Sequence, residues 1–241
     1  MLRVAALVAV IVGGVAVLLL PERVRWRWLR RMHAAALRAM GVRLQVTGGG
    51  AWADRVGEGV LVVANHLSWI DGLALSTVAP LRIVAKREIR GWPVLGLLME
   101  RAGAVFVDRA RLGALQSSVT EITDVLRGGD AVGVFPEGTT YCGAADIRFR
   151  RAPFQAAIDA GARVRPVAIA LRLPDGRRAP AAWVAEGTWW DDVCRVVRIQ
   201  GLRCEVVVLP LLAGDAACTR RELALRAQSA IADVLGGRPE R

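Results

Sequence analysis

From about Val42 onward, short β-branched runs alternate with Ala- and Leu-rich stretches, and this alternation is the strongest constraint on the fold. Such runs favour strands, and the longer Ala- and Leu-rich stretches favour helices. Repeated strand–helix units predict the α/β class, here a single mixed, largely parallel sheet flanked by helices. The expected strands cover residues 42–47, 60–64, 81–85, 104–107, 131–135, 165–171 and 204–209, and the expected helices cover 72–78, 94–101, 112–127, 153–160 and 220–235.

Before this region, residues 4–20 form an unbroken run of apolar residues and glycines. As a helix the run would be roughly 25 Å long, at about 1.5 Å per residue, which is close to the thickness of a bilayer's hydrocarbon core. A cleaved signal peptide would end in small residues, whereas this run ends at Pro21-Glu22. The sequence therefore predicts a retained N-terminal membrane-anchoring helix.

Residues 22–40 follow the run and contain six Arg and one Glu, so they carry +5 of the formal net charge of +11. Arg3 is the only basic side chain before the run. The positive-inside rule then places the body of the protein on the cytoplasmic side of the inner membrane. A basic, Trp-containing juxtamembrane helix is typical of a membrane surface. Four apolar residues fall roughly on one face of that helix: Trp26, Leu29, Leu37 and Met40.

The positive charge does not indicate a nucleic-acid-binding protein, because much of it is juxtamembrane and the chain contains no recognisable nucleic-acid-binding module. The four cysteines show neither C-x-x-C pairing nor histidines at metal-site spacing, so no metal site is expected. Unpaired thiols are typical of a reducing compartment.

One of the two histidines, His66, directly follows the apolar run 60–64, and Asp71 lies five residues further on. In open α/β sheets, chemistry is concentrated at the carboxyl ends of strands. An imidazole can shuttle protons near neutral pH, and a nearby carboxylate can hold its other nitrogen. A turn histidine, with Asp71 merely starting a helix, explains this stretch equally well.

Three further blocks lie near predicted strand ends, and the ordered set resembles the PlsC-type glycerolipid acyltransferases, which include the 1-acyl-glycerol-3-phosphate acyltransferases. The resemblance covers residues from about 40 to 175 and makes 41–241 an acyltransferase domain behind the 1–40 anchor and basic interfacial helix. The family's N-H-x4-D motif matches Asn65-His66 and Asp71, its G-x-x-F-x-x-R motif matches Gly103, Phe106 and Arg109, its F-P-E-G-T motif matches 135–139, and its late proline matches Pro166.

The resemblance implies an O-acyltransferase that needs no metal or cofactor. His66 would be the general base and Asp71 its support, while Pro166 would lie on the acyl-donor side. A fatty acyl group would pass from acyl-CoA or acyl carrier protein to a lysolipid in the bilayer, most commonly 1-acyl-glycerol-3-phosphate to give phosphatidate. The residues implied to bind the acceptor are Lys86, which is the only lysine in the chain, Gly103, Phe106, Arg109, Glu137, Gly138 and Thr139.

Two positions depart from the commonest pattern. Thr140 stands where many lysophosphatidate acyltransferases have Arg, and Ala152 stands where many members have Gly. Both are features of a subgroup that includes lyso-ornithine lipid O-acyltransferases, which is the alternative acceptor assignment. Two remoter alternatives are a hydrolase using Ser68, which lacks a G-x-S-x-G context, and a non-catalytic membrane-surface protein, which predicts damage at His66 or Asp71.

Overall fold

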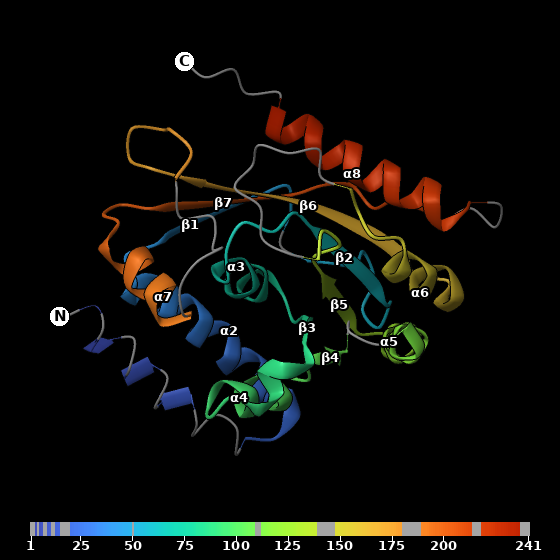
Figure 1. Ribbon diagram of the computed structural model, residues 1–241, viewed down its shortest axis with the longest axis horizontal. Helices are drawn as coiled ribbons and strands as arrows, with labels where there is room; N and C mark the ends of the chain where they lie inside the picture. Colours follow the sequence, from blue (N-terminus) through green and yellow to red (C-terminus); the bar gives the residue numbers. More distant parts are fainter. Residues whose placement is uncertain are drawn as a thin grey trace.

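The computed structural model describes residues 3, 5, 6, 9, 10, 13, 14, 20–49, 51–108, 112–138, 148–179, 189–213 and 218–236. Figure 1 shows one twisted sheet with helices on both faces. The sheet has seven strands in the order β1-β7-β6-β2-β5-β3-β4. The strands are β1 (Arg43–Thr47), β2 (Val60–Ala64), β3 (Arg82–Lys86), β4 (Val105–Val107), β5 (Ala131–Val134), β6 (Arg163–Arg172) and β7 (Arg203–Val208).

Neighbouring strands are parallel everywhere except at the β6–β7 pair, which is antiparallel. This confirms the single mixed, largely parallel sheet predicted from the sequence. Because β2, β3, β4, β5 and β6 run in the same direction, their carboxyl ends lie along one edge of the sheet, here called the carboxyl edge. Their starting ends lie along the opposite edge, here called the amino edge.

Every residue of β2 is buried, as expected for a central parallel strand covered on both faces. Val60, Val62 and Ala64 pack into one core, and Leu61 and Val63 pack into the other. The first core includes side chains of α2 (Glu22–Ala39), α3 (Ile70–Val78) and α7 (Trp189–Arg198), and the second includes side chains of α5 (Leu112–Arg127), α6 (Ala152–Ala160) and α8 (Arg220–Gly236). The strand's alternation therefore divides its side chains between two helical layers.

Two elements were not expected from the sequence. The 3-10 helix η1 (Arg87–Gly91) follows β3 directly and precedes α4 (Leu95–Arg101). The helix α7 buries Val193, Val196 and Val197 in the first core. β-branched residues have weak helix propensity, so tertiary packing is what selects the helix here.

The helix α2 contributes its apolar face to the protein's own core. Leu29, Leu37 and Met40 are all at most 3% exposed. This is the face that the sequence suggested for a membrane surface, so any lipid contact by α2 must use another face.

Described parts of the N-terminal apolar run lie beside α2. The Arg3 guanidinium donates to the carbonyl oxygens of Val197 and Ile199, at 2.9 and 3.2 Å. Gly14 lies against Met32 of α2 and Leu98 of α4. Within the described parts of the chain, no helix combines the length and apolar character needed to cross a bilayer.

Candidate active site

The turn that carries His66 begins where β2 leaves the sheet. The side-chain amide of Asn65 donates to the Ile169 carbonyl at 2.9 Å and accepts from the Ile169 N–H at 2.8 Å. Asn65 is 2% exposed, so both bonds are shielded from water. The β2–β6 ladder ends at Ala64 and Val167, and the Asn65 side chain continues it as a backbone would. The start of the turn that carries His66 is thereby held to β6.

Asp71 organises the rest of this turn from the first turn of α3. Its Oδ2 accepts the backbone N–H groups of Leu67 and Ser68, at 2.6 and 2.7 Å, and lies 3.0 Å from His66 Nδ1. Asp71 is fully buried, and the His66 side chain is 22% exposed. Because a carboxylate oxygen accepts and does not donate, Nδ1 carries the proton and Nε2 of the neutral ring keeps its lone pair.

Phe135 and Glu137 support His66 from the loop after β5. The Phe135 ring stacks on the imidazole, with centroids 4.1 Å apart and planes 18° apart. Glu137 Oε2 accepts the His66 backbone N–H at 3.2 Å, and Glu137 is 5% exposed. The pKa of Glu137 is raised from 4.5 to about 8. Burial is the largest cause, the hydrogen bond from the His66 N–H partly opposes it, and the nearby Asp71 carboxylate adds a smaller increase.

Both buried carboxyl groups retain an oxygen without a hydrogen-bond partner in the described structure, Asp71 Oδ1 and Glu137 Oε1. Unsatisfied buried carboxyl oxygens are costly, and such strain is concentrated at functional sites. The imidazole is thus held by its ring face, its Nδ1 and its backbone N–H, while Nε2 stays available. This arrangement can remove a proton from a hydroxyl placed at Nε2.

The predicted acceptor residues do not all lie at the carboxyl edge. Lys86 is exposed at the carboxyl end of β3, and no side-chain partner is recorded for it within the described structure. Phe106 is central in the short strand β4, with the Arg90 guanidinium 5.8 Å from its ring centroid. Gly103 precedes β4 at the amino edge with φ +71°, and an added Cβ would collide with the Arg82 guanidinium.

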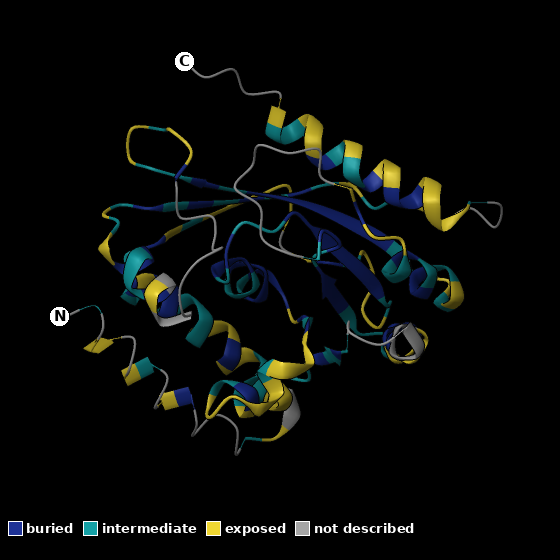
Figure 2. Cartoon of the chain, viewed as in Figure 1, coloured by how far each residue is buried: buried dark blue, intermediate teal, exposed yellow. Residues whose placement is uncertain are grey.

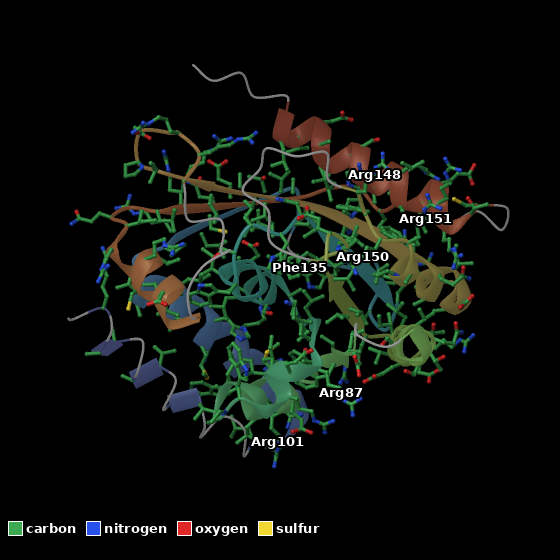
Figure 3. All side chains as sticks on the ribbon, in the orientation of Figure 1. Arg87, Arg101, Phe135, Arg148, Arg150 and Arg151 are labelled. Carbon is green, nitrogen blue, oxygen red and sulfur yellow. The ribbon has the colours of Figure 1, made fainter. Side chains whose placement is uncertain are left out.

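Gly138 has φ +78°, and an added Cβ would come within 2.6 Å of Arg150 Nε. The Arg150 backbone N–H donates to the Pro136 carbonyl at 2.9 Å, so Arg150 joins the loop that holds Glu137. Figure 3 labels both Phe135 and Arg150. Three residues named from the sequence lie outside the described residues: Arg109, Thr139 and Thr140.

Pro166 lies within β6, paired in register with Val63, and its carbonyl accepts the Leu209 N–H at 3.0 Å. It is buried in the sheet, three residues before the level of Ile169. A hollow of about 540 Å³ lies at the amino edge, between the loop before β2 and the starts of β3 and β5. That hollow is therefore on the opposite side of the sheet from His66.

From the sequence, no role was expected for Phe135, and Asn65 was noted only because it matches the first position of the N-H-x4-D motif. The signal for Phe135 was its position at the head of the Phe-Pro-Glu-Gly block, directly after an apolar strand. The stacking itself depends on β5 lying beside β2, and strand order was not readable from the sequence.

The family model described as Acyltransferase matches residues 43–170. This chain belongs to the acyltransferase family. The family match includes His66, Asp71 and Glu137, and it confirms the resemblance inferred from the ordered motifs.

Curated relatives of this family member fall into two groups. A 1-acyl-sn-glycerol-3-phosphate acyltransferase of Neisseria gonorrhoeae is 38% identical, over 71% of this chain and 66% of that protein. A lyso-ornithine lipid O-acyltransferase of Brucella abortus is 34% identical, over 83% of this chain and 78% of that protein. The chain thus spans just under two thirds of the gonococcal relative's length.

The fold has a solved counterpart. The crystal structure of the 1-acyl-sn-glycerophosphate acyltransferase PlsC of Thermotoga maritima superposes with a TM-score of 0.70, covering 97% of this chain and 92% of the other. At 20% identity this likeness establishes the shared fold alone.

Proposed function

We propose that this acyltransferase transfers a fatty acyl group from an acyl thioester to the free hydroxyl of a lysolipid. The leading acceptor is 1-acyl-glycerol-3-phosphate, which would give phosphatidate. The observation that carries the proposal is the 3.0 Å contact between His66 Nδ1 and the fully buried Asp71. This contact sets the imidazole to accept a proton at Nε2.

In the proposed reaction, His66 Nε2 takes the proton of the acceptor hydroxyl as its oxygen attacks the thioester carbonyl. The carbon–sulfur bond then breaks, an ester forms, and the proton on Nε2 passes to the departing thiolate. A thioester is already activated, so positioning and a general base suffice. Asp71 stabilises the imidazolium that forms in between. The thiol carrier is coenzyme A or acyl carrier protein.

Ser68 does not fit the role of a covalent nucleophile in this geometry. It is 4% exposed, and its backbone N–H is committed to Asp71 Oδ2. Across the described residues, no hydrogen bond joins its hydroxyl to His66. Direct attack by the acceptor hydroxyl therefore has more support than a serine ester intermediate.

The second candidate acceptor is lyso-ornithine lipid. Relatives carrying that name align over more of this chain than the gonococcal protein does, reaching 88% for the enzyme of Pseudomonas aeruginosa at 32% identity. Thr140 and Ala152 also agree with that assignment. Lys86 and Arg150, which lack recorded acidic partners in the described structure, are suited to an anionic headgroup of either acceptor.

Membrane attachment by the N-terminus is also part of this proposal, with the body facing the cytoplasm. It is supported by the apolar run of residues 4–20 and by the basic helix α2. Since α2 contributes core side chains, the informative truncation removes residues 1–20 only. We expect that truncation to shift the protein from the membrane fraction toward the soluble fraction after cell lysis.

The catalytic proposal is tested with radiolabelled acyl donors and a panel of lysolipids in membranes that contain the full chain. His66→Ala should lower acyl transfer to every acceptor by about 10²- to 10⁴-fold, the range typical of a general base. The matched control is His33→Ala, which removes the other histidine and should leave turnover nearly unchanged. Acyl transfer that survives His66→Ala would show that the base has been wrongly assigned.

A further inference from the structure

The segment just before α6 is hydrogen-bonded to two distant parts of the chain. Its Phe149 N–H donates to the side-chain oxygen of Gln228, in the C-terminal helix α8, at 3.0 Å. The following N–H, that of Arg150, donates to the Pro136 carbonyl, in the loop after β5, at 2.9 Å. The backbone at Arg150 is therefore held from both sides.

Gln228 belongs to a helix that is packed against the body of the protein. Figure 2 shows the exposed residues of α8 on its outer side and the buried ones toward the sheet. Gln228 is half-buried beside the second core, which also contains Phe149. Its bond to the Phe149 N–H is therefore partly shielded from water, where a lost partner costs more. The buried residues of α8 are Leu223, Ala224, Ala227 and Ile231.

The side chain of Arg150 lies on the loop that carries Glu137. Gly138 has no side chain, and a Cβ added there would be 2.6 Å from Arg150 Nε and 2.8 Å from its Cζ. The guanidinium therefore lies against the backbone of this loop, directly after Glu137, whose Oε2 accepts the His66 N–H. This places a positive charge close to the groups that support the imidazole.

The charge of Arg150 has no acidic partner among the residues that the structure describes. The chain has 33 Lys and Arg but only 22 Asp and Glu, so an unpaired arginine means little by itself, and its place decides. Glu137 does not neutralise it, because Oε2 accepts the His66 N–H and Oε1 has no partner in the described structure. A guanidinium left open beside a proton-accepting imidazole suits a phosphate or carboxylate on the molecule whose hydroxyl reacts.

We propose that Arg150 binds the anionic headgroup of the acceptor and that Gln228 is a positioning residue, which holds Arg150 in place through the Phe149 N–H. This inference rests on the proposed function and deepens it. The anion is the phosphate of lysophosphatidate or the carboxylate of an ornithine headgroup. Gln228 lies outside the family-matched residues 43–170, so acceptor recognition depends on the C-terminal helix as well as on the matched region.

The first test measures acceptor binding without turnover, using the full chain with His66→Ala and radiolabelled short-chain lysolipids below their micelle concentration. Adding Arg150→Gln should raise the Kd for lysophosphatidate about tenfold, which corresponds to about 1.4 kcal/mol. The Kd for an uncharged monoacylglycerol of the same chain length should not change. Arg151→Gln is the matched control, because Arg151 is also exposed and Figure 3 labels it farther from Phe135 than Arg150.

The same assay with short-chain lyso-ornithine lipid distinguishes the two anions. A rise in Kd for only one of the two acceptors would support the proposal and identify the anion that Arg150 binds. An unchanged Kd for both acceptors would overturn it, as would an equal rise for the uncharged monoacylglycerol, because that would indicate a role in the fold.

The second test asks whether Gln228 acts through Arg150. Gln228→Leu leaves the Phe149 N–H without its partner and should raise the Kd for the anionic acceptor by roughly threefold. Gln228→Glu keeps an accepting oxygen and should restore most of the affinity. Because residues that act as a unit are non-additive, Gln228→Leu should add little to a chain that already carries Arg150→Gln.

The matched control for this second test is Gln155→Leu, since the Gln155 side chain bonds only within α6, to Asp159 at 2.8 Å. Fully additive effects of Gln228→Leu and Arg150→Gln would overturn the positioning role. Binding that follows the expected pattern in a chain that transfers no acyl group, even with His66 intact, would count against the proposed function alone. Absence of binding to either anionic acceptor would overturn the recognition role of Arg150.

Discussion

The two edges of the sheet differ in how completely their charged side chains are paired. At the amino edge, Arg163 bonds to Asp54 and Glu58 at 2.7 to 2.9 Å, and Arg82 bonds to Asp130 at 2.7 Å. At the carboxyl edge, the buried Asp71 and Glu137 each keep an oxygen without a partner in the described structure. Complete pairing suits a structural role. Incomplete pairing around a histidine suits chemistry, because the site retains polar capacity for a substrate.

The sharpest test of this contrast is Asp71→Asn. An amide can donate to His66 Nδ1 and so favour the tautomer that carries its proton on Nε2, which cannot act as a base. We expect turnover to fall by about 10²- to 10⁴-fold, with the largest effect on kcat. The measurement is a pH–rate profile beside a thermal unfolding curve. Asp124→Asn, on the exposed side of α5, should change neither.

Asn65→Ala removes the side-chain amide that joins the end of β2 to Ile169 of β6. It leaves the buried N–H and carbonyl of Ile169 without partners, which should lower the free energy of unfolding by about 2–4 kcal/mol. Turnover should also fall, because His66 follows directly. Urea unfolding measures the first effect and initial rates measure the second. A loss of stability without any change in kcat would show that the two Asn65–Ile169 hydrogen bonds support the fold and not catalysis.

At the amino edge, Arg165→Ala should reduce stability and leave the chemistry intact. Arg165 donates to the Trp52 and Leu209 carbonyls at 2.8 and 3.1 Å, so its loss should cost about 1–3 kcal/mol. The rate per folded molecule should be unchanged. Arg177→Ala removes an exposed pair with Asp175 and should cost less than about 0.5 kcal/mol.

A more gradual effect concerns pH. The folded-state pKa of Glu137 is raised from 4.5 to about 8, so its stabilisation is full below pH 4.5 and is lost as pH rises toward 8. Burial lowers the pKa of His33 from 6.5 to about 4, so that contribution is lost only as pH falls below 6.5. Between pH 6.5 and 8 the unfolding free energy should therefore fall, by at most about 1.4 kcal/mol per pH unit from Glu137.

Glu137→Gln should remove this slope, and denaturant titrations at a series of pH values would measure it. His33→Gln is the control, since it should change the pH dependence only between pH 4 and 6.5, where the His33 and Glu137 contributions have opposite slopes. A slope above pH 6.5 that persists in Glu137→Gln would mean that another group titrates there.

Much of the fold followed from local pattern. The apolar run 60–64 is a fully buried strand with the expected bounds. The helix expected over 153–160 begins one residue earlier, at Ala152, and is capped by Gly161, which has φ +65°. The helix α7 was missed because Val193, Val196 and Val197 are weak helix formers. Only burial against the sheet makes that segment helical.

The candidate site was likewise predictable only in part. His66 and Asp71 were found from a five-residue spacing and a preceding strand, since a short turn brings such residues together regardless of the rest of the chain. The positions of Gly103 at the amino edge and Arg150 against Gly138 were not readable from spacing. Both depend on which strands are neighbours.

By itself, the sequence determined the α/β class, the family and the pairing of His66 with Asp71, because hydrophobic periodicity and short-range motifs are local properties of the chain. Tertiary structure alone decided that Phe135 stacks on His66, that Glu137 is buried beneath it, and that α2 turns its apolar face into the core. Those outcomes depend on strand order and on competition for buried surface. Both are settled only when distant segments pack together.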